Sequence, residues 1–182
     1  GNKPTMFLSS EALAETMAQF GDVIRLGIFA HTHMDEMRLL EPADSSAAEK
    51  GVAVKMVPSI SPVDGNNPSF VVARIDAATA TMKDYRVIAA SNKTGIETTW
   101  AEEYDFAQTY KEPAFSAATV ANLVEHFEAD RNAETKASES YIHNYEVGQP
   151  LRALKLVWPM YVCALKNDEA AAFDNCVCGA TP

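Results

Sequence analysis

The sequence predicts an α+β fold in which a strand-rich first half precedes a helical second half. Up to Ile88, apolar residues alternate or form runs of about four to eight, a spacing typical of strands. From Trp100 onward they recur every three to four residues or so, which is typical of helices. The change falls near Asn92. We therefore expect residues 1–91 to form a helix and a mixed sheet that is incomplete as a domain, and residues 92–182 to form a helical subdomain.

The first half begins with one predicted helix. Leu13, Met17 and Phe20 share a helical face, and Ser9 or Ser10 can cap its start. A nearly continuous apolar run then indicates a buried strand over residues 22–29. Further strands are expected at residues 37–40, 52–57, 70–76 and 82–88, the last two joined as a hairpin by residues 77–80. Between them, the segment 58–68 contains three prolines and predicts a long ordered loop.

The second half carries amphipathic helical stripes. Ser116 can cap a helix, and Pro159 is expected to start or kink a later one. Packing of these stripes against each other and the sheet is favoured over a lipid-binding groove. The two stripes consist of Val120, Leu123, Val124 and Phe127, and of Leu151, Leu154, Trp158, Tyr161, Val162 and Leu165.

Composition limits the classes of function. The chain has 182 residues, is 47% hydrophobic and carries a formal net charge of −10. Such an acidic chain is a poor match for the phosphate backbone of nucleic acids or for anionic membranes. No apolar run approaches the roughly 20 residues that a transmembrane helix needs. We therefore expect neither a nucleic-acid partner nor a transmembrane segment.

Two of the four histidines lie one residue apart directly after the predicted strand 22–29. His31 and His33 at the end of a strand can direct two imidazole nitrogens into one cleft, which suits one metal ion or two neighbouring ions. The alternative is a polar loop that happens to contain two histidines. His126 and His143 fall on predicted helices, and we interpret both as surface or structural residues.

The cysteines lie close to the C-terminus. Cys176 and Cys178 are two residues apart, which is a poor geometry for a bridge between them. Cys163 could pair with either, leaving the third thiol outside the bridge, and a metal site built from all three is the alternative. A disulfide would indicate an exported protein.

Three segments together resemble a known family. Residues 30–36, Ala-His-Thr-His-Met-Asp-Glu, resemble the last metal motif of calcineurin-like metallophosphoesterases, written Gly-His-x-His. Residues 58–70, followed by Ile75-Asp76, are similar to the segment after this motif in acid sphingomyelinase-like phosphodiesterases. The tail resembles that family's C-terminal helical subdomain, in its late cysteines and in Trp100, Glu103-Tyr104 and Tyr110.

This resemblance implies the C-terminal portion of a metallophosphoesterase α/β sandwich, followed by the helical subdomain. It implies a phosphoester hydrolase with two divalent metal ions, usually zinc, that activate a hydroxide. His31 would bind one ion and His33 the other, and Asp35 could orient a ligand histidine. The loop at 58–70 would line the substrate cleft, with Asn67 and Pro68 shaping it. The substrate would be a phosphodiester or phosphomonoester of a small molecule or a lipid head group.

The chain also departs from the family. The family's Asp-x-His, Gly-Asp, Asn-His and further His ligands precede this motif, and none is present here. We therefore expect a missing N-terminal catalytic half, an inactive isolated chain, and secretion or export to the periplasm through a signal peptide upstream of residue 1. Ala30 replaces the usual glycine, and Val63 stands where many relatives have an aromatic residue, so recognition of the head group does not carry over.

Other classes of function remain open. The chain could be a noncatalytic interaction module that retains the His-x-His pair as structure. A weaker alternative is a single-metal protein of the cupin type, although no predicted strand supplies the later histidine that such a site needs. A natural precursor with the upstream ligands would favour the hydrolase, and a complete gene beginning near Asn2 would favour the module.

Overall fold

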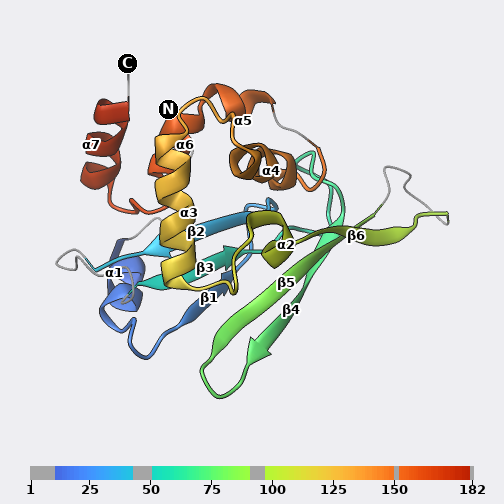
Figure 1. The fold of residues 1–182 in the computed structure, drawn as a ribbon, viewed down its shortest axis with the longest axis horizontal. Helices are drawn as coiled ribbons and strands as arrows, with labels where there is room; N and C mark the ends of the chain where they lie inside the picture. The colour runs from blue at the N-terminus through green and yellow to red at the C-terminus, as the bar shows by residue number, and fades with distance from the viewer. Residues whose placement is uncertain (1–10, 43–50, 91–96, 150–151, 181–182) are drawn as a thin grey trace.

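The computed structural model describes residues 11–42, 51–90, 97–149 and 152–180, and these form two three-stranded sheets and the helices that pack against them (Figure 1). The α+β class is therefore confirmed. The elements are α1 (Glu11–Gln19), β1 (Leu26–Phe29), β2 (Glu36–Leu40), β3 (Val52–Met56), β4 (Ser69–Asp76), β5 (Thr81–Ala90), β6 (Trp100–Asp105), α2 (Phe106–Tyr110), α3 (Ala117–Ala129), α4 (Lys136–Tyr145), α5 (Arg152–Leu156), α6 (Trp158–Cys163) and α7 (Ala170–Ala180).

The first sheet has the strand order β1-β3-β2. β1 runs parallel to β3, with Leu26 opposite Ala53, and β2 runs antiparallel to β3. Every residue of β2 and β3 is buried, whereas β1 is an edge strand with exposed positions. The strand predicted over residues 22–29 is thus shorter than expected and is not buried throughout, because among the described residues β1 pairs on one side only, with β3. Ile28 is 55% exposed.

The second sheet has the order β4-β5-β6 and is antiparallel throughout. The predicted hairpin is confirmed, with Asp76 opposite Thr81. β6 corrects the prediction that the chain is helical from Trp100 onward. Trp100 and Tyr104 are four residues apart, a spacing that also suits a helix, but the segment pairs with residues 86–90 of β5. Pairing with a long neighbouring strand therefore overrides the local pattern.

The two sheets face each other at two contacts. The ammonium group of Lys55 in β3 lies 4.7 Å from the centroid of the Tyr85 ring in β5. The hydroxyl of Tyr104 in β6 donates a hydrogen bond to Asp35, which directly precedes β2. The two sheets therefore meet through β3 and β5 and through the start of β2 and β6.

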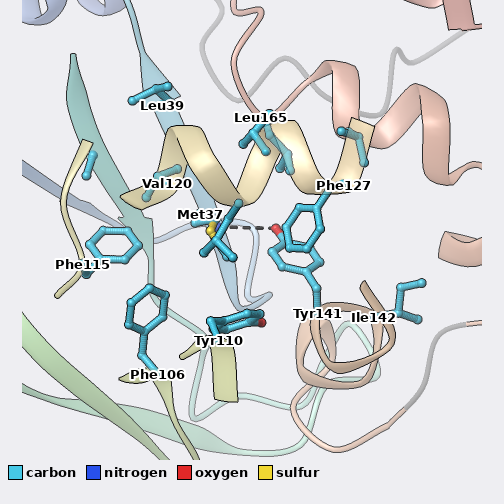
Figure 2. Close-up of a cluster of buried hydrophobic side chains, with 14 of the residues drawn as sticks. Met37, Leu39, Phe106, Tyr110, Phe115, Val120, Phe127, Tyr141, Ile142 and Leu165 are labelled. Carbon is cyan, nitrogen blue, oxygen red and sulfur yellow. Dashed lines mark hydrogen bonds between the residues drawn. The ribbon is translucent and has the colours of Figure 1, made fainter. Parts of the chain in front are cut away.

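The largest hydrophobic cluster lies between the sheets and the helices, and Figure 2 shows part of it. The predicted stripe on α3 is confirmed, since Val120, Leu123, Val124 and Phe127 are all buried. Ser116 caps this helix by accepting a hydrogen bond from the Thr119 amide at 3.3 Å. The cluster also takes Met37 and Leu39 from β2 and Tyr141 and Trp158 from the helical tail. Residues from both sides of the predicted domain boundary after residue 91 therefore share one core, and the segment 91–96 itself lies outside the described residues.

The first helix packs on a different face from the one predicted. Ala14 and Ala18 are buried, whereas Leu13 and Phe20 are exposed. Small residues allow α1 to lie close to the first sheet, where Met17 approaches Gly27 so closely that a Cβ atom there would lie 3.2 Å from the methionine methyl group. The proposed caps Ser9 and Ser10 fall outside the described residues. The apolar stripe of the tail is split, because α5 ends at Leu156 and Pro159 lies in the first turn of α6. Of the helices described, none is long and apolar enough to cross a bilayer.

Candidate functional site

The histidine loop (residues 30–35) links β1 to β2 and contains two strained residues. His31 has a φ of 102° and His33 a φ of 65°. Side chains other than glycine seldom adopt positive φ, although histidine tolerates it better than most. Each such residue costs on the order of 1–3 kcal/mol, and such strain is concentrated at functional sites. The loop thus combines the two predicted ligands with the backbone conformation that a binding site often requires.

His33 has a carboxylate beside one ring nitrogen. Its Nδ1 atom lies 2.9 Å from Asp64 Oδ2, and both side chains are partly exposed. The two atoms are within ion-pair distance, but Nδ1 makes no hydrogen bond to the described part of the chain. A carboxylate on one imidazole nitrogen is the usual arrangement behind a metal-binding histidine, because it orients the ring and leaves the other nitrogen for the ion. Nε2 of His33 is the atom available for such binding.

The 58–68 loop brings Asp64 to this place. The Ser59 amide donates a hydrogen bond to the carbonyl oxygen of His33 at 3.2 Å, which joins the two loops. Asn66 Nδ2 and the Ser69 amide each donate to the Ser59 carbonyl at 3.0 Å, so the loop closes on itself. Gly65 provides a φ of 91° directly after Asp64. The carboxylate therefore sits at the tip of a loop anchored to the histidine loop.

The residues predicted to shape the cleft occupy different environments. Asn67 is buried, and its Nδ2 atom donates to the Val147 carbonyl at 2.6 Å while Gln149 Nε2 donates to its Oδ1 atom at 2.7 Å. These bonds dock the loop on the end of α4. The Pro68 carbonyl accepts a hydrogen bond from the Ala90 amide at 2.8 Å. Val63 is 73% exposed. Asn67 and Pro68 thus hold the loop in place, and Val63 faces solvent.

Asp35 has other partners than the histidine predicted for it. Its carboxylate is buried and accepts hydrogen bonds from the Lys55 ammonium group and, at 3.0 Å, from the Tyr104 hydroxyl. Its amide donates to the Tyr145 carbonyl at 2.9 Å. Burial raises the pKa of Asp35, against the opposing effect of Lys55, and burial lowers the pKa of Lys55. Asp35 therefore fixes the end of the histidine loop to the protein interior.

A second set of buried, hydrogen-bonded side chains, centred on Glu36, lies next to the set formed by Asp35, Lys55 and Tyr104. Arg38 donates to Glu36 Oε2 at 3.3 Å and to the Ala164 carbonyl at 2.6 Å. The Tyr161 hydroxyl donates to the same Glu36 oxygen at 3.0 Å, and the Tyr141 hydroxyl lies 3.0 Å from that of Tyr161. Burial and the Glu36 carboxylate raise the pKa of Tyr161 well above its usual value. Together, the hydrogen bonds around Asp35 and those around Glu36 connect the segment after the histidines to β3, β6 and the helical tail.

Sequence reasoning missed the residues that support the histidines. The sequence places Asp64 only within a loop, and no pattern links it to His33. Lys55 and Arg38 each interrupt a strand that is otherwise mostly apolar, and a charge in the middle of a buried strand is rarely left unpaired. That interruption was the available signal. Their partners could not be identified in this way, because Lys55 and Asp35 are 20 residues apart.

The described residues fit only part of a two-metal site. His31 is exposed and His33 is partly exposed, so both imidazoles are accessible. Thr32 Oγ1 and Asn66 Oδ1, on the two adjoining loops, are buried and make no hydrogen bond to the described part of the chain. In that part, however, no group of three or more histidine, cysteine, aspartate or glutamate side chains could hold a metal ion. Further ligands would have to come from elsewhere.

The remaining histidines and the cysteines lie apart from this loop. His143 Nε2 on α4 is 3.2 Å from Glu103 Oε1, and His126 is exposed on α3. Cys163 and Cys176 form a disulfide with their Cα atoms 5.8 Å apart, and Cys178 lies exposed outside the bridge. The bridge is one of the two pairings left open by the sequence. It joins α6 to α7.

Comparisons with known proteins do not identify the chain: no protein-family model matches it, and no curated protein does either. The functional assignment therefore depends on the residues and their geometry.

Proposed function

We propose that this chain is the C-terminal part of a metal-dependent phosphoester hydrolase of the acid sphingomyelinase-like branch. His31 and His33 each bind one divalent ion, zinc by preference. The observation that carries the proposal is the Asp64 carboxylate, which lies 2.9 Å from His33 Nδ1 and leaves Nε2 as the ring nitrogen for a ligand. The left-handed backbone at both histidines and their position after a parallel strand support it.

Each residue of the site has a separate task. His31 and His33 bind, Asp64 orients the His33 ring, and the Asn67 side chain holds the 58–68 loop beside them. Bound metal ions would supply the activated hydroxide and neutralise charge on the phosphoryl oxygens. The substrate is a phosphodiester or phosphomonoester. The disulfide between Cys163 and Cys176 supports a secreted or periplasmic location, with the signal peptide upstream of residue 1.

The described residues contribute two imidazoles, and a two-metal site needs several further ligands. The missing ligands belong to an N-terminal half outside these 182 residues. The isolated chain should therefore hydrolyse a chromogenic phosphodiester no faster than background, even with added zinc. Robust zinc-dependent turnover by the isolated chain would contradict the claim that these 182 residues contain only part of the two-metal site.

The decisive experiment uses the protein extended upstream as its natural gene encodes it. His31→Ala and His33→Ala should each lower kcat by orders of magnitude, because a metal ligand acts directly on the nucleophile. Asp64→Asn should weaken zinc binding by roughly 10- to 100-fold, the usual effect of losing the residue behind a ligand histidine. Zinc affinity and turnover are measured on the same samples.

His143→Ala is the matched control, because His143 also lies beside a carboxylate, 3.2 Å from Glu103, but on α4. It should leave zinc affinity and turnover unchanged. An extended protein that tolerates both His31→Ala and His33→Ala would remove the reason for assigning the chain to phosphoesterases.

The second candidate function is a noncatalytic interaction module. It is favoured by one observation, namely that no third metal ligand joins the two histidines within the described residues. A complete natural gene that begins near Asn2 and encodes a protein without zinc affinity would establish this alternative.

A further inference from the structure

The segment that ends α4 presents backbone carbonyl groups to both loops of the candidate site. We call residues 145–149 the α4 turn. Its first three carbonyl oxygens accept hydrogen bonds, in chain order, from the Asp35 amide at 2.9 Å, from the Asn67 amide at 3.2 Å and from Asn67 Nδ2 at 2.6 Å. Asp35 ends the histidine loop, and Asn67 belongs to the 58–68 loop. One short segment of the helical tail therefore binds both loops.

The backbone of the α4 turn is folded for this contact. Carbonyl groups at the end of a helix have no partner within the helix and need acceptor contacts elsewhere. The Val147 amide donates to the Asn144 carbonyl at 2.8 Å and the Gly148 amide to the His143 carbonyl at 3.1 Å, which closes the helix end. Val147 is fully buried at a φ of 55°, which is rare for a β-branched residue. Strained backbone of this kind is concentrated at functional sites.

The Gln149 side chain fixes the orientation of the Asn67 amide group. Gln149 Nε2 donates to Asn67 Oδ1 at 2.7 Å, while Asn67 Nδ2 donates to the Val147 carbonyl. A side-chain amide has one accepting end and one donating end, so these two bonds specify a single orientation. Asn67 is buried, and Gln149 supplies the donor that its oxygen requires.

The Asp64 carboxylate lies between the two attachments of the 58–68 loop. At one end, the Ser59 amide is bonded to the His33 carbonyl at 3.2 Å. At the other end, Asn67 is bonded to the α4 turn. The Asp64 side chain is 53% exposed, and its contact with His33 Nδ1 depends on where these two ends are held.

We propose that Gln149 is a positioning residue of the metal site. Through Asn67 it holds the 58–68 loop at the separation from the histidine loop that keeps the Asp64 carboxylate beside the His33 ring. The inference rests on the proposed function, because it concerns the geometry of that site. The helical tail thereby controls a site to which it contributes no ligand.

The first measurement is backbone hydrogen exchange in the 182-residue chain, which needs neither metal nor turnover. Gln149→Ala should make the Ser59 and Asn67 amides exchange about 10-fold or more faster, because a buried acceptor is left unpaired and the loop opens more often. Gln149→Glu has nearly the same shape but no donor at neutral pH, so it should behave like Gln149→Ala. Gln108→Ala, at an exposed position on α2, is the control and should leave both amides unchanged.

The second measurement separates positioning from simple stabilisation, and it uses the protein extended upstream as its natural gene encodes it. Gln149→Ala should weaken zinc binding by up to about 10-fold, less than Asp64→Asn, because it displaces the carboxylate without removing it. In an Asp64→Asn background, Gln149→Ala should cause no further loss, since a residue that acts through Asp64 cannot act without it. Gln108→Ala should leave zinc affinity unchanged in both backgrounds.

Three results would overturn the inference. These are unchanged exchange of the Ser59 and Asn67 amides in Gln149→Ala, wild-type behaviour of Gln149→Glu, and losses of zinc affinity from Gln149→Ala and Asp64→Asn that add independently. Failure of the proposed function looks different. An extended protein that binds no zinc would reject that function and with it the role of Gln149 at a metal site, whereas zinc binding that is indifferent to Gln149→Ala would reject the positioning role alone.

Discussion

The histidine loop and the strand that follows it differ sharply over only a few residues. His31 is exposed and held at a φ of 102°, whereas Asp35 and Arg38 are buried and hydrogen-bonded. The first segment has the features of a binding site, which are strain and accessible nitrogen atoms. The second has the features of its support, since each charge has a partner in the interior. A strained loop persists only when its surroundings over-determine it, and the buried polar groups provide that constraint.

The largest effect is expected from Lys55→Met, which leaves the Asp35 carboxylate buried without its cation. Removing one member of a buried ion pair costs roughly 3–5 kcal/mol of unfolding free energy. Chemical denaturation measures the change. Lys83→Met is the control, because Lys83 and Asp76 form a pair with both side chains partly exposed, and such pairs contribute about 1 kcal/mol or less. Equal costs for the two variants would contradict the supporting role of the buried pair.

Tyr161→Phe tests the buried hydrogen bonds around Glu36. The Tyr161 hydroxyl donates to Glu36 and lies beside the Tyr141 hydroxyl, so its removal leaves a buried carboxylate short of a donor. The expected cost is about 1–3 kcal/mol of unfolding free energy. Tyr145→Phe is the matched control, because that hydroxyl makes no hydrogen bond to the described residues. A similar cost for both variants would show that ring packing, rather than the hydroxyl, stabilises this region.

Asp168, which interacts with the buried Arg38, makes the free energy of unfolding depend on pH. Burial raises the pKa of Asp168 to about 6, although Arg38 acts in the opposite direction. An acid whose pKa is raised in the folded state stabilises the fold below its unfolded pKa of about 4, and this contribution is lost as the pH rises through 6. Asp168→Asn should therefore match the wild type at pH 4 and exceed its unfolding free energy by roughly 1–3 kcal/mol at pH 7.5.

Denaturation of the wild type and Asp168→Asn at both pH values measures this difference. Asp22→Asn, at an exposed position, should show no such change. A constant difference between the wild type and Asp168→Asn across this range would refute the assignment of the pH dependence to Asp168.

His31→Gly should have the smallest effect and the opposite sign. Glycine adopts a positive φ without steric cost, so the variant should gain about 0.5–1 kcal/mol of unfolding free energy. It should also lose zinc affinity in the extended protein. Lys111→Gly, at a φ of 61°, should give a similar gain and leave zinc binding unchanged. Destabilisation by His31→Gly alone would mean that the imidazole supports the fold rather than a ligand.

Local pattern alone determined much of this architecture. The hairpin of β4 and β5, the buried stripe of α3 with its Ser116 cap, and the position of His31 after a strand all follow from residues close together in the sequence. Such features depend on side-chain periodicity and backbone preference, which a single segment expresses by itself.

Only the tertiary structure decided the rest. β6 is a strand because β5 provides a partner, and Ile28 is exposed because the sheet ends at β1. Cys163 pairs with Cys176 rather than Cys178 because of how α7 turns back on α6. The hydrogen bond from Tyr104 to Asp35 spans 69 residues of sequence. Contacts of this kind arise when distant segments meet and must satisfy each other's buried polar groups, and no local spacing in the sequence encodes which segments will meet.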